Sequence, residues 1–237
     1  MTFSIIARDE QTGRMGAAVA SKFLAVGARN VAVRTGVGSV VSQAVFNPYY
    51  GPRGLALLAT GAKAADAVRL LIAADEGRQL RQVHTMDRYG QLAAHTGSQC
   101  NAWCGHLLKP TFSVAGNTLA GAGVLQAMVD AYEANAEVPF ARRLIAAMQA
   151  GEAAGGDSRG RQSAALVVHD QEDYSLLDLR ADDNSDPLAE IARLEEIARQ
   201  SWVHFRRVLP SASNPNGVLD SAEIDATIAA SIAEGRE

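Results

Sequence analysis

The stretch from Gly155 to Ser163 gathers several chemically active side chains in one turn. It reads Gly-Gly-Asp-Ser-Arg-Gly-Arg-Gln-Ser, and its polar side chains belong to Asp157, Ser158, Arg159, Arg161, Gln162 and Ser163. An alanine-rich helical pattern precedes it and an apolar run follows, so the two glycines can end the helix and turn the chain into a strand. Such a turn can bind an anion or orient a nucleophile, but a solvated turn in which Asp157 pairs with an arginine fits equally well.

Thr2 is the second candidate, because it directly follows the initiator methionine. Removal of Met1 is expected before so small a residue, and it would leave Thr2 with a free α-amine. An amine with a pKa of about 8 can take the proton of the hydroxyl, which turns an N-terminal threonine into a nucleophile. Ser21 and Lys22 end the second predicted strand, so in an intact hairpin they lie beside Thr2. Lys22 could then lower the pKa of the nucleophile or hold an anionic substrate, unless it is simply exposed at a strand end.

The segment from His95 to His106 contains both cysteines of the chain, Cys100 and Cys104. A Cys-x3-Cys spacing with one nearby histidine lacks the second ligand pair that makes a zinc site persuasive. A catalytic thiol would need a histidine as its base, and spacing alone does not show one. We therefore expect buried thiols and a hydrogen-bonded histidine here, with no metal and no cofactor.

Composition narrows the class of protein. The 237 residues are 48% hydrophobic, which is enough for the core of one large domain. A formal net charge of -4 without a run of lysine or arginine argues against nucleic-acid binding. Arg8 and Asp9 interrupt the first apolar run, so no signal peptide is expected, and no apolar stretch has membrane-spanning length. We expect a globular, cytoplasmic protein.

Hydrophobic periodicity predicts strand groups that alternate with helices. Strands are expected over residues 2–8, 15–20, 31–34, 37–46, 80–86, 91–96, 112–115, 163–169 and 174–179. Helices are expected over residues 54–60, 63–74, 121–135, 139–151 and 187–209, and residues 97–109 are expected to be irregular. Hairpins without a β-α-β rhythm favour an α+β fold, in which two mostly antiparallel sheets pack together and are covered by helices. A doubly wound parallel sheet is the rival.

The C-terminal residues are predicted to form a separate extension. Residues 210–217 are typical of a linker, and Asp220 with Glu223 predicts the start of a last helix. The predicted organisation is therefore one domain over residues 1–209, followed by a linker and helix over residues 210–237.

Several motifs together resemble a bacterial family known as domain of unknown function 1028. They are Thr2–Asp9, Gly16–Gly27, Asn47–Leu55, His95–Gly97 with Cys100, Trp103 and Gly105–His106, Ala115–Asn117, and Gly156–Ala165. The resemblance spans Thr2 to about Leu209. It implies an N-terminal nucleophile (Ntn) hydrolase-like fold, which is a four-layer αββα sandwich.

This resemblance also implies a chemistry. Ntn hydrolases, such as proteasome β-subunits and glycosylasparaginase, cleave amide bonds with an N-terminal Thr, Ser or Cys. By position, Thr2 would be the nucleophile, with Ser21 and Lys22 beside it and Asp157 in a supporting role. The residues expected to bind a small-molecule substrate are Asn47, His95, Asn117, Arg159, Arg161, Gln162 and Ser163.

Two functions of different class follow for the sequence. One is an amidohydrolase that cleaves a C–N bond in a small amide or peptide-like metabolite. The other is a non-catalytic binding protein that uses Asp157, Arg159 and Arg161 to hold an anionic small molecule. In either case we expect a homo-oligomer, a dimer or larger.

Overall fold

The computed structural model describes residues 2–235, so the predicted removal of Met1 concerns a residue outside the described part. The chain forms two compact units, one extending to Ile191 and the other beginning at Ala192. The boundary lies inside α6 (Pro187–Gln200), earlier than the predicted boundary after residue 209. The helix predicted to continue to residue 209 ends at Gln200.

Residues after α6 form two short helical turns and one longer helix. These are α7 (Trp202–Phe205), η2 (Arg206–Val208) and α8 (Ser221–Ala233). The Asp220 side chain accepts a hydrogen bond from the Glu223 backbone N–H at 2.9 Å, which confirms the predicted helix start. No helix within residues 2–235 is both long enough and apolar enough to cross a membrane.

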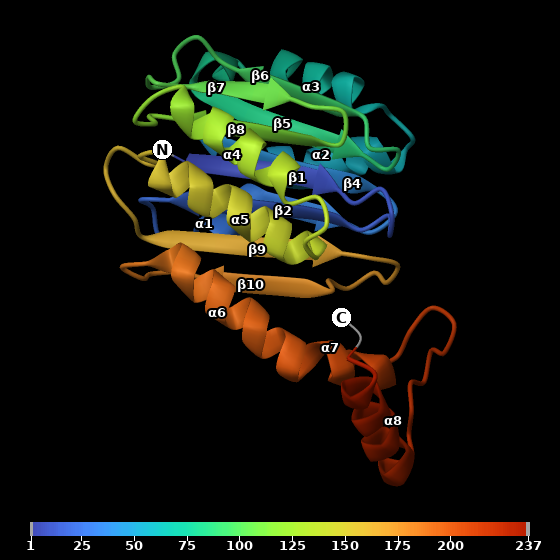
Figure 1. The fold of residues 1–237 in the computed structure, drawn as a ribbon. Helices are drawn as coiled ribbons and strands as arrows, with labels where there is room; N and C mark the ends of the chain where they lie inside the picture. Colours follow the sequence, from blue (N-terminus) through green and yellow to red (C-terminus); the bar gives the residue numbers. More distant parts are fainter. Residues whose placement is uncertain (1, 236–237) are drawn as a thin grey trace. The chain divides into compact units, whose positions relative to one another are not determined.

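Two antiparallel sheets form the centre of the first unit (Figure 1). The six-stranded sheet has the order β10-β9-β2-β1-β8-β7, with bounds Leu177–Ala181, Ser163–His169, Met15–Ser21, Thr2–Arg8, Phe112–Asn117 and Gly105–Leu108. The four-stranded sheet has the order β3-β4-β5-β6, with bounds Val31–Arg34, Gly38–Ala44, Arg81–Asp87 and Leu92–Thr96. The N-terminal strand β1 is central, paired with β2 on one side and β8 on the other.

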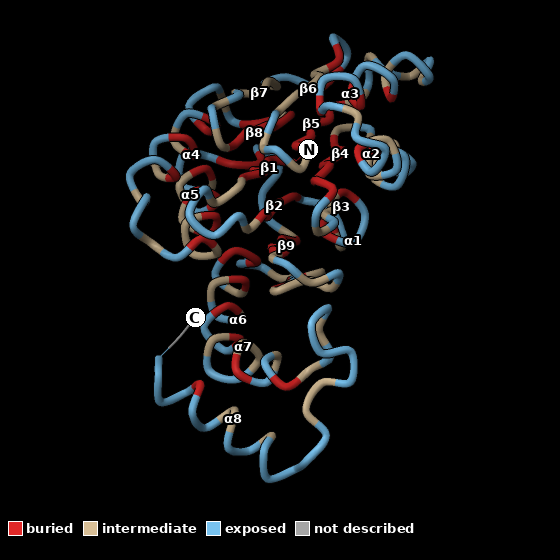
Figure 2. Tube along the Cα trace, turned by 90° about the vertical axis from the view of Figure 1, so that its right-hand side faces the viewer, coloured by how far each residue is buried: buried red, intermediate tan, exposed pale blue. Residues whose placement is uncertain are grey.

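Helices cover the outer face of each sheet (Figure 2). Helices α4 (Gly123–Ala134) and α5 (Phe140–Ala153) pack on the six-stranded sheet. Helices α2 (Tyr50–Ala59) and α3 (Ala64–Ala73) pack on the four-stranded sheet. The predicted four-layer αββα sandwich with antiparallel sheets is thus confirmed.

Two elements were absent from the prediction. Strand β7 arises in the stretch expected to be irregular, and the five-residue helix α1 (Val26–Asn30) follows β2. Helix α1 lies against β9 so closely that a Cβ on Gly27 would be 2.2 Å from the Cβ of Ala165. Elements this short depend on such tertiary contacts, because local periodicity barely distinguishes them.

Alternation along β1 decides which side chains face the space between the sheets. Phe3 packs near α5, since a Cβ on Gly151 of that helix would lie 3.4 Å from the Phe3 ring. Ile6 belongs to the apolar cluster between the sheets, and Ser4 is hydrogen-bonded to a residue of β4. Because strand side chains alternate, Thr2 shares the inner face with Ser4 and Ile6.

Candidate functional site

Thr2 begins β1 with its side chain buried at one corner of the two-sheet interior. Its Oγ1 donates a hydrogen bond to Ser21 Oγ at 3.2 Å, across the β1–β2 ladder. On the other side of β1, Asn117 of β8 is paired directly opposite Thr2. The three residues are only 2–4% exposed, so strand pairing fixes the Thr2 hydroxyl from both sides.

A pocket of about 260 Å³ opens at this corner. Its lining residues come from the start of β1, the end of β2 with the loop after it, the end of α1, and the end of β4 with the loop after it: Thr2, Ser21, Phe23, Asn30, Ala44, Val45 and Phe46. The Phe23 and Phe46 rings meet edge to face, with centroids 6.2 Å apart. The pocket therefore combines one buried hydroxyl pair with largely apolar walls.

Strained backbone surrounds the same corner. Among residues 2–235, the non-glycine residues with positive φ are Ala25 (54°), Ala44 (68°) and Thr118 (52°). Ala44 lines the pocket, Ala25 is two residues after the pocket residue Phe23, and Thr118 directly follows Asn117. A left-handed conformation costs a non-glycine residue about 1–2 kcal/mol and is concentrated at functional sites.

Asp157 joins the predicted turn to the end of β2. Its Oδ2 accepts the backbone N–H of Lys22 at 2.7 Å, one residue beyond Ser21. Its Oδ1 accepts the backbone N–H of Arg159 at 2.9 Å, and the Arg159 guanidinium lies 3.2 Å from Oδ2. The carboxylate is thus a structural support for the strand end next to Thr2.

The side chains of Lys22 and Arg161 are bound to other protein groups and do not line the Thr2 pocket. The ammonium of Lys22 donates to the Arg161 carbonyl oxygen at 3.0 Å, so it is engaged on the turn. The Arg161 guanidinium forms ion pairs with Glu152 at 2.5 Å and with Asp186 at 3.3 Å. Burial raises the pKa of Glu152, and the neighbouring Arg161 opposes that shift.

Gln162 and Ser163, the last two residues of the turn, contact different parts of the protein. Gln162 donates to Asp183 at the exposed surface, at 3.2 Å. Ser163 accepts the Val26 backbone N–H at 3.1 Å and donates to the Phe23 carbonyl oxygen. Ser163 therefore holds the loop that carries one wall of the pocket.

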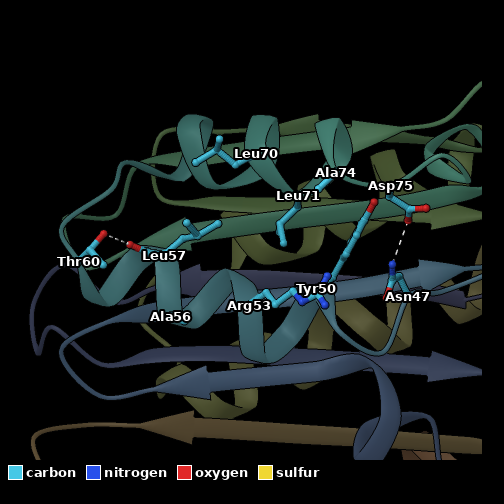
Figure 3. Close-up of a pocket in the computed structure, with 10 residues that line it drawn as sticks. All are labelled: Asn47, Tyr50, Arg53, Ala56, Leu57, Thr60, Leu70, Leu71, Ala74 and Asp75. Carbon is cyan, nitrogen blue, oxygen red and sulfur yellow. Dashed lines mark hydrogen bonds between the residues drawn. The ribbon is translucent and has the colours of Figure 1, made fainter.

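Asn47 lies in a different and larger cavity, of about 490 Å³, between α2 and α3 (Figure 3). Its Nδ2 donates to Asp75 Oδ2 at 3.0 Å, and Arg81 Nε donates to the same oxygen at 3.1 Å. Burial opposes ionisation, yet these hydrogen bonds hold the pKa of Asp75 well below its usual range. Asp75 is therefore an ionised carboxylate and only a weak base at neutral pH, and this cavity contains neither Thr2 nor Asp157.

The histidine and cysteine segment provides no ligand cluster. His95 lies at the half-buried edge strand β6 and its Nε2 is 2.9 Å from the Arg78 carbonyl oxygen. The Cys100 and Cys104 thiols donate to backbone carbonyl oxygens, and burial raises the pKa of both. Residues 2–235 contain no group of three or more His, Cys, Asp or Glu side chains able to hold a metal ion.

A buried polar network lies behind Thr2, and the sequence analysis singled out only Asn117 among its members. It fills the space between the sheets and consists of Ser4, Gln43, Gln82, His84, Ser113 and Asn117, each at most 2% exposed. Asn117 Nδ2 donates to Gln82 Oε1 at 3.1 Å, which connects the network to the residue opposite Thr2. The available signal was polar residues at inward positions of otherwise apolar strands.

Backbone carbonyls set the direction of every hydrogen bond in this network. Gln82 Nε2 donates to the carbonyl oxygens of Gly105 and Gly116, each at 2.9 Å, so Gln82 Oε1 is an acceptor. Gln43 must therefore present Nε2 to Gln82, at 2.7 Å, and Oε1 to Ser4, at 2.7 Å. Since the Ser4 hydroxyl gives its one proton to Gln43, it can only accept from its next neighbour.

That neighbour is His84, whose proton position follows. His84 Nε2 lies 2.9 Å from Ser4 Oγ and must donate. Because burial lowers the pKa of His84, the ring stays neutral, and Nδ1 therefore accepts from Ser113 Oγ at 2.7 Å. The imidazole is neutral in this arrangement. Burial lowers the pKa of His84 to about 3, and the charge of His106 acts in the same direction.

The depressed pKa of His84 predicts a loss of stability in acid. The unfolded chain, with a histidine pKa of about 6.5, takes up this proton before the folded protein does. The contribution of neutral His84 to the free energy of unfolding is therefore complete above about pH 6.5. It declines by about 1.4 kcal/mol per pH unit as the pH falls toward 3. Urea denaturation at several pH values in this range gives the free energy of unfolding of the wild type and of His84→Gln. This free energy should fall less steeply with decreasing pH in the variant than in the wild type. A His84 ring that titrates near pH 6.5 by NMR, or that carries its proton on Nδ1, would contradict the assignment.

Comparison with known proteins places the chain in context. A model described as a family of unknown function, DUF1028, matches residues 2–191. The crystal structure of protein SPO2555 from Silicibacter pomeroyi, assigned to the same family model, is 33% identical with a TM-score of 0.86. The similarity covers 92% of this chain and 99% of that chain. No curated protein matches the sequence.

More distant structures share far less. Anbu (ancestral beta-subunit) from Yersinia bercovieri is 12% identical with a TM-score of 0.39, over 84% of this chain and 97% of that chain. An Anbu mutant from Hyphomicrobium sp. strain MC1 is also 12% identical, with a TM-score of 0.34, over 85% and 96% of the two chains.

Proposed function

The chain belongs to the family of unknown function DUF1028, and since this family carries no named reaction, we propose one from the geometry of the Thr2 corner. We propose that the protein is a hydrolase that cleaves the C–N bond of a small amide, with Thr2 as its nucleophile. The observation that carries the proposal is the Thr2 hydroxyl, fixed between two strands, hydrogen-bonded to Ser21 and open to a small pocket.

The reaction has two halves. In the first, the α-amine of Thr2, freed by loss of Met1, accepts the hydroxyl proton while Oγ1 attacks the amide carbon. The C–N bond breaks, the nitrogen leaves with that proton as an amine, and an acyl ester remains on Thr2. In the second half, the same amine takes a proton from water, and the resulting hydroxide attacks the acyl carbon. The bond from that carbon to Oγ1 breaks, the amine returns its proton to Oγ1, and a carboxylic acid is released with Thr2 restored.

Ser21, Asp157 and Asn117 position Thr2 through hydrogen bonds. None of them places a charge in the pocket. Ser21 accepts the hydrogen bond of Thr2 Oγ1 and so holds this side chain in one position, and the hydroxyl proton turns from Ser21 to the α-amine when Oγ1 attacks. Asp157 holds the backbone just after Ser21, and Asn117 ties the opposite strand to the buried network. Such preorganisation is worth about 10²-fold or more when the reacting atoms must meet within a few ångströms.

Observed ion pairs argue against anion binding by the turn. Arg159 pairs with Asp157, and Arg161 pairs with both Glu152 and Asp186. An external carboxylate bound there would compete with these acidic partners for the same guanidinium groups. The amidohydrolase is therefore preferred over the binding protein considered from sequence.

The proposed function is tested by freeing or blocking the N-terminus. Purified protein should have lost Met1 by intact mass and should hydrolyse members of a panel of small amides. An uncleavable tag before Thr2 is expected to remove turnover, whereas the same tag after the C-terminus should leave it unchanged. Full activity of the N-terminally tagged protein would exclude the α-amine as the base.

A further inference from the structure

The cavity between α2 and α3 has one polar end and is mainly apolar along the rest of its length (Figure 3). Asn47 lies shortly before α2 and donates to Asp75, which follows α3, so the start of one helix meets the end of the other here. Beyond this end, the walls are small or branched apolar side chains, those of Ala56, Leu57, Leu70 and Leu71. A volume of about 490 Å³ is sufficient for a small molecule, and the change from polar to apolar suits an elongated one with a single polar head.

Arg53 gives the polar end of this cavity a net positive charge. Asp75 also lines this end, but it is paired with Arg81 at 3.1 Å. Burial raises the pKa of Tyr50, and the neighbouring Asp75 carboxylate acts in the same direction, so the phenol is neutral. Within residues 2–235 the Arg53 guanidinium has no carboxylate partner, and it lies 4.8 Å from the centre of the exposed Tyr49 ring. The charge of Arg53 is therefore available to an anionic ligand.

We propose that this cavity binds a medium-chain carboxylate, with the head group on Arg53 and the alkyl chain between α2 and α3. A guanidinium presents paired N–H donors that match the two oxygens of a carboxylate. Lining residues on α2 extend from Tyr50 to Leu57, a rise of about 10 Å that an alkyl chain can follow. The chain also covers Leu70, which is 41% exposed in the empty cavity. The two cavities share no lining residue, so the proposal is independent of the hydrolase function proposed for Thr2.

Four ligands test the proposal on the purified full-length protein by calorimetry. Octanoate, 1-octanol and octylammonium share a chain and differ in the head group, whereas butyrate keeps the carboxylate on a shorter chain. Octanoate is expected to saturate a single site and to bind about fivefold or more tightly than octanol or octylammonium. It should bind at least about tenfold more tightly than butyrate, because each buried methylene adds about fourfold in affinity. Equal affinities of octanoate and octanol or of octanoate and butyrate, tighter binding of octylammonium, or no saturable binding of octanoate would overturn the proposal.

Substitution of Arg53 tests where the head group binds. Arg53→Gln removes the positive charge and should bring the affinities of octanoate and octanol together. Arg69→Gln is the matched control, because Arg69 lies on α3 with a side chain that is 66% exposed and outside the cavity lining. This control should keep the preference for octanoate. A preference that survives in Arg53→Gln would contradict the assignment of the head group.

Filling the cavity tests where the chain binds. Ala56 lines the cavity from an exposed position of α2, so Ala56→Phe should fill the space and prevent octanoate binding while the protein stays folded. Ala59→Phe places the same side chain on an exposed position of the same helix outside the lining, and it should bind octanoate as the wild type does. Octanoate binding that is unchanged in Ala56→Phe would mean that the ligand occupies another site. Thermal unfolding verifies each variant, and if Ala56→Phe does not fold, the exposed substitution Arg53→Gln still decides the question.

Discussion

Exchange of Thr2 for alanine is expected to lower amide turnover by at least about 10³-fold while the protein remains folded. The change removes the attacking oxygen, and loss of a catalytic nucleophile typically costs 10³-fold to 10⁶-fold. The structural cost is small, because the variant loses one hydrogen bond at 3.2 Å to Ser21. That bond is worth about 1 kcal/mol. Steady-state hydrolysis and thermal unfolding of the two proteins give both quantities.

The controls separate chemistry from packing. Thr2→Ser keeps a hydroxyl and an α-amine, so measurable turnover should persist. Thr60→Ala removes another threonine hydroxyl, on an exposed residue just after α2, and should leave turnover unchanged. Wild-type activity in Thr2→Ala would refute the proposed mechanism.

Removing the Asp157 carboxylate is expected to destabilise the protein by about 2–4 kcal/mol and to lower turnover. The Asp157 side chain is 3% exposed and accepts two backbone N–H groups and one guanidinium. Hydrogen bonds to a charged group contribute about 1.5–3 kcal/mol, and Asp157→Ala leaves the N–H of Lys22 without its acceptor. The midpoint of urea denaturation and the rate of amide hydrolysis measure the two effects.

Asp66→Ala is a suitable comparison for that substitution. Asp66 pairs with Arg69 on the surface of α3, where the side chains are 52% and 66% exposed. Such a pair contributes about 0–1 kcal/mol, so the variant should unfold almost as wild type does. Equal effects of the two aspartate substitutions would mean that Asp157 is only a surface residue of the turn.

Much of the fold was predictable because its signals are local. The alternation of residues 2–8 and the small, apolar run of residues 15–20 predicted the hairpin of β1 and β2, and Asp220 with Glu223 predicted the start of α8. Strand β7 and helix α1 were not predicted, because residues 105–108 and 26–30 are short and also lack a clear alternation or helical period of their own. Their stability comes from neighbours distant in sequence, as the contact of Gly27 with Ala165 illustrates.

The residues of the candidate site likewise fall into those that local sequence patterns indicated and those that depend on contacts distant in sequence. Thr2, Ser21 and Asp157 were brought to one corner as the pattern of hairpin and turn indicated. Asn30 was not singled out, because nothing in the sequence indicates that the short helix α1 places this residue in the wall of the pocket beside Thr2. The roles assigned to these residues stay predictions until the variants are measured.

The central place of β1 also has a consequence for when the protein becomes competent during its synthesis. Thr2 leaves the ribosome first, yet its partner Asn117 and the support Asp157 follow more than a hundred residues later. Ser21 in turn pairs with Ser163 of β9, so the corner closes only after most of the first unit has been made. Contacts of such long sequence separation form late and slowly. A nascent or truncated chain therefore carries the proposed nucleophile without the walls that orient it, and we expect only the completed sandwich to be active.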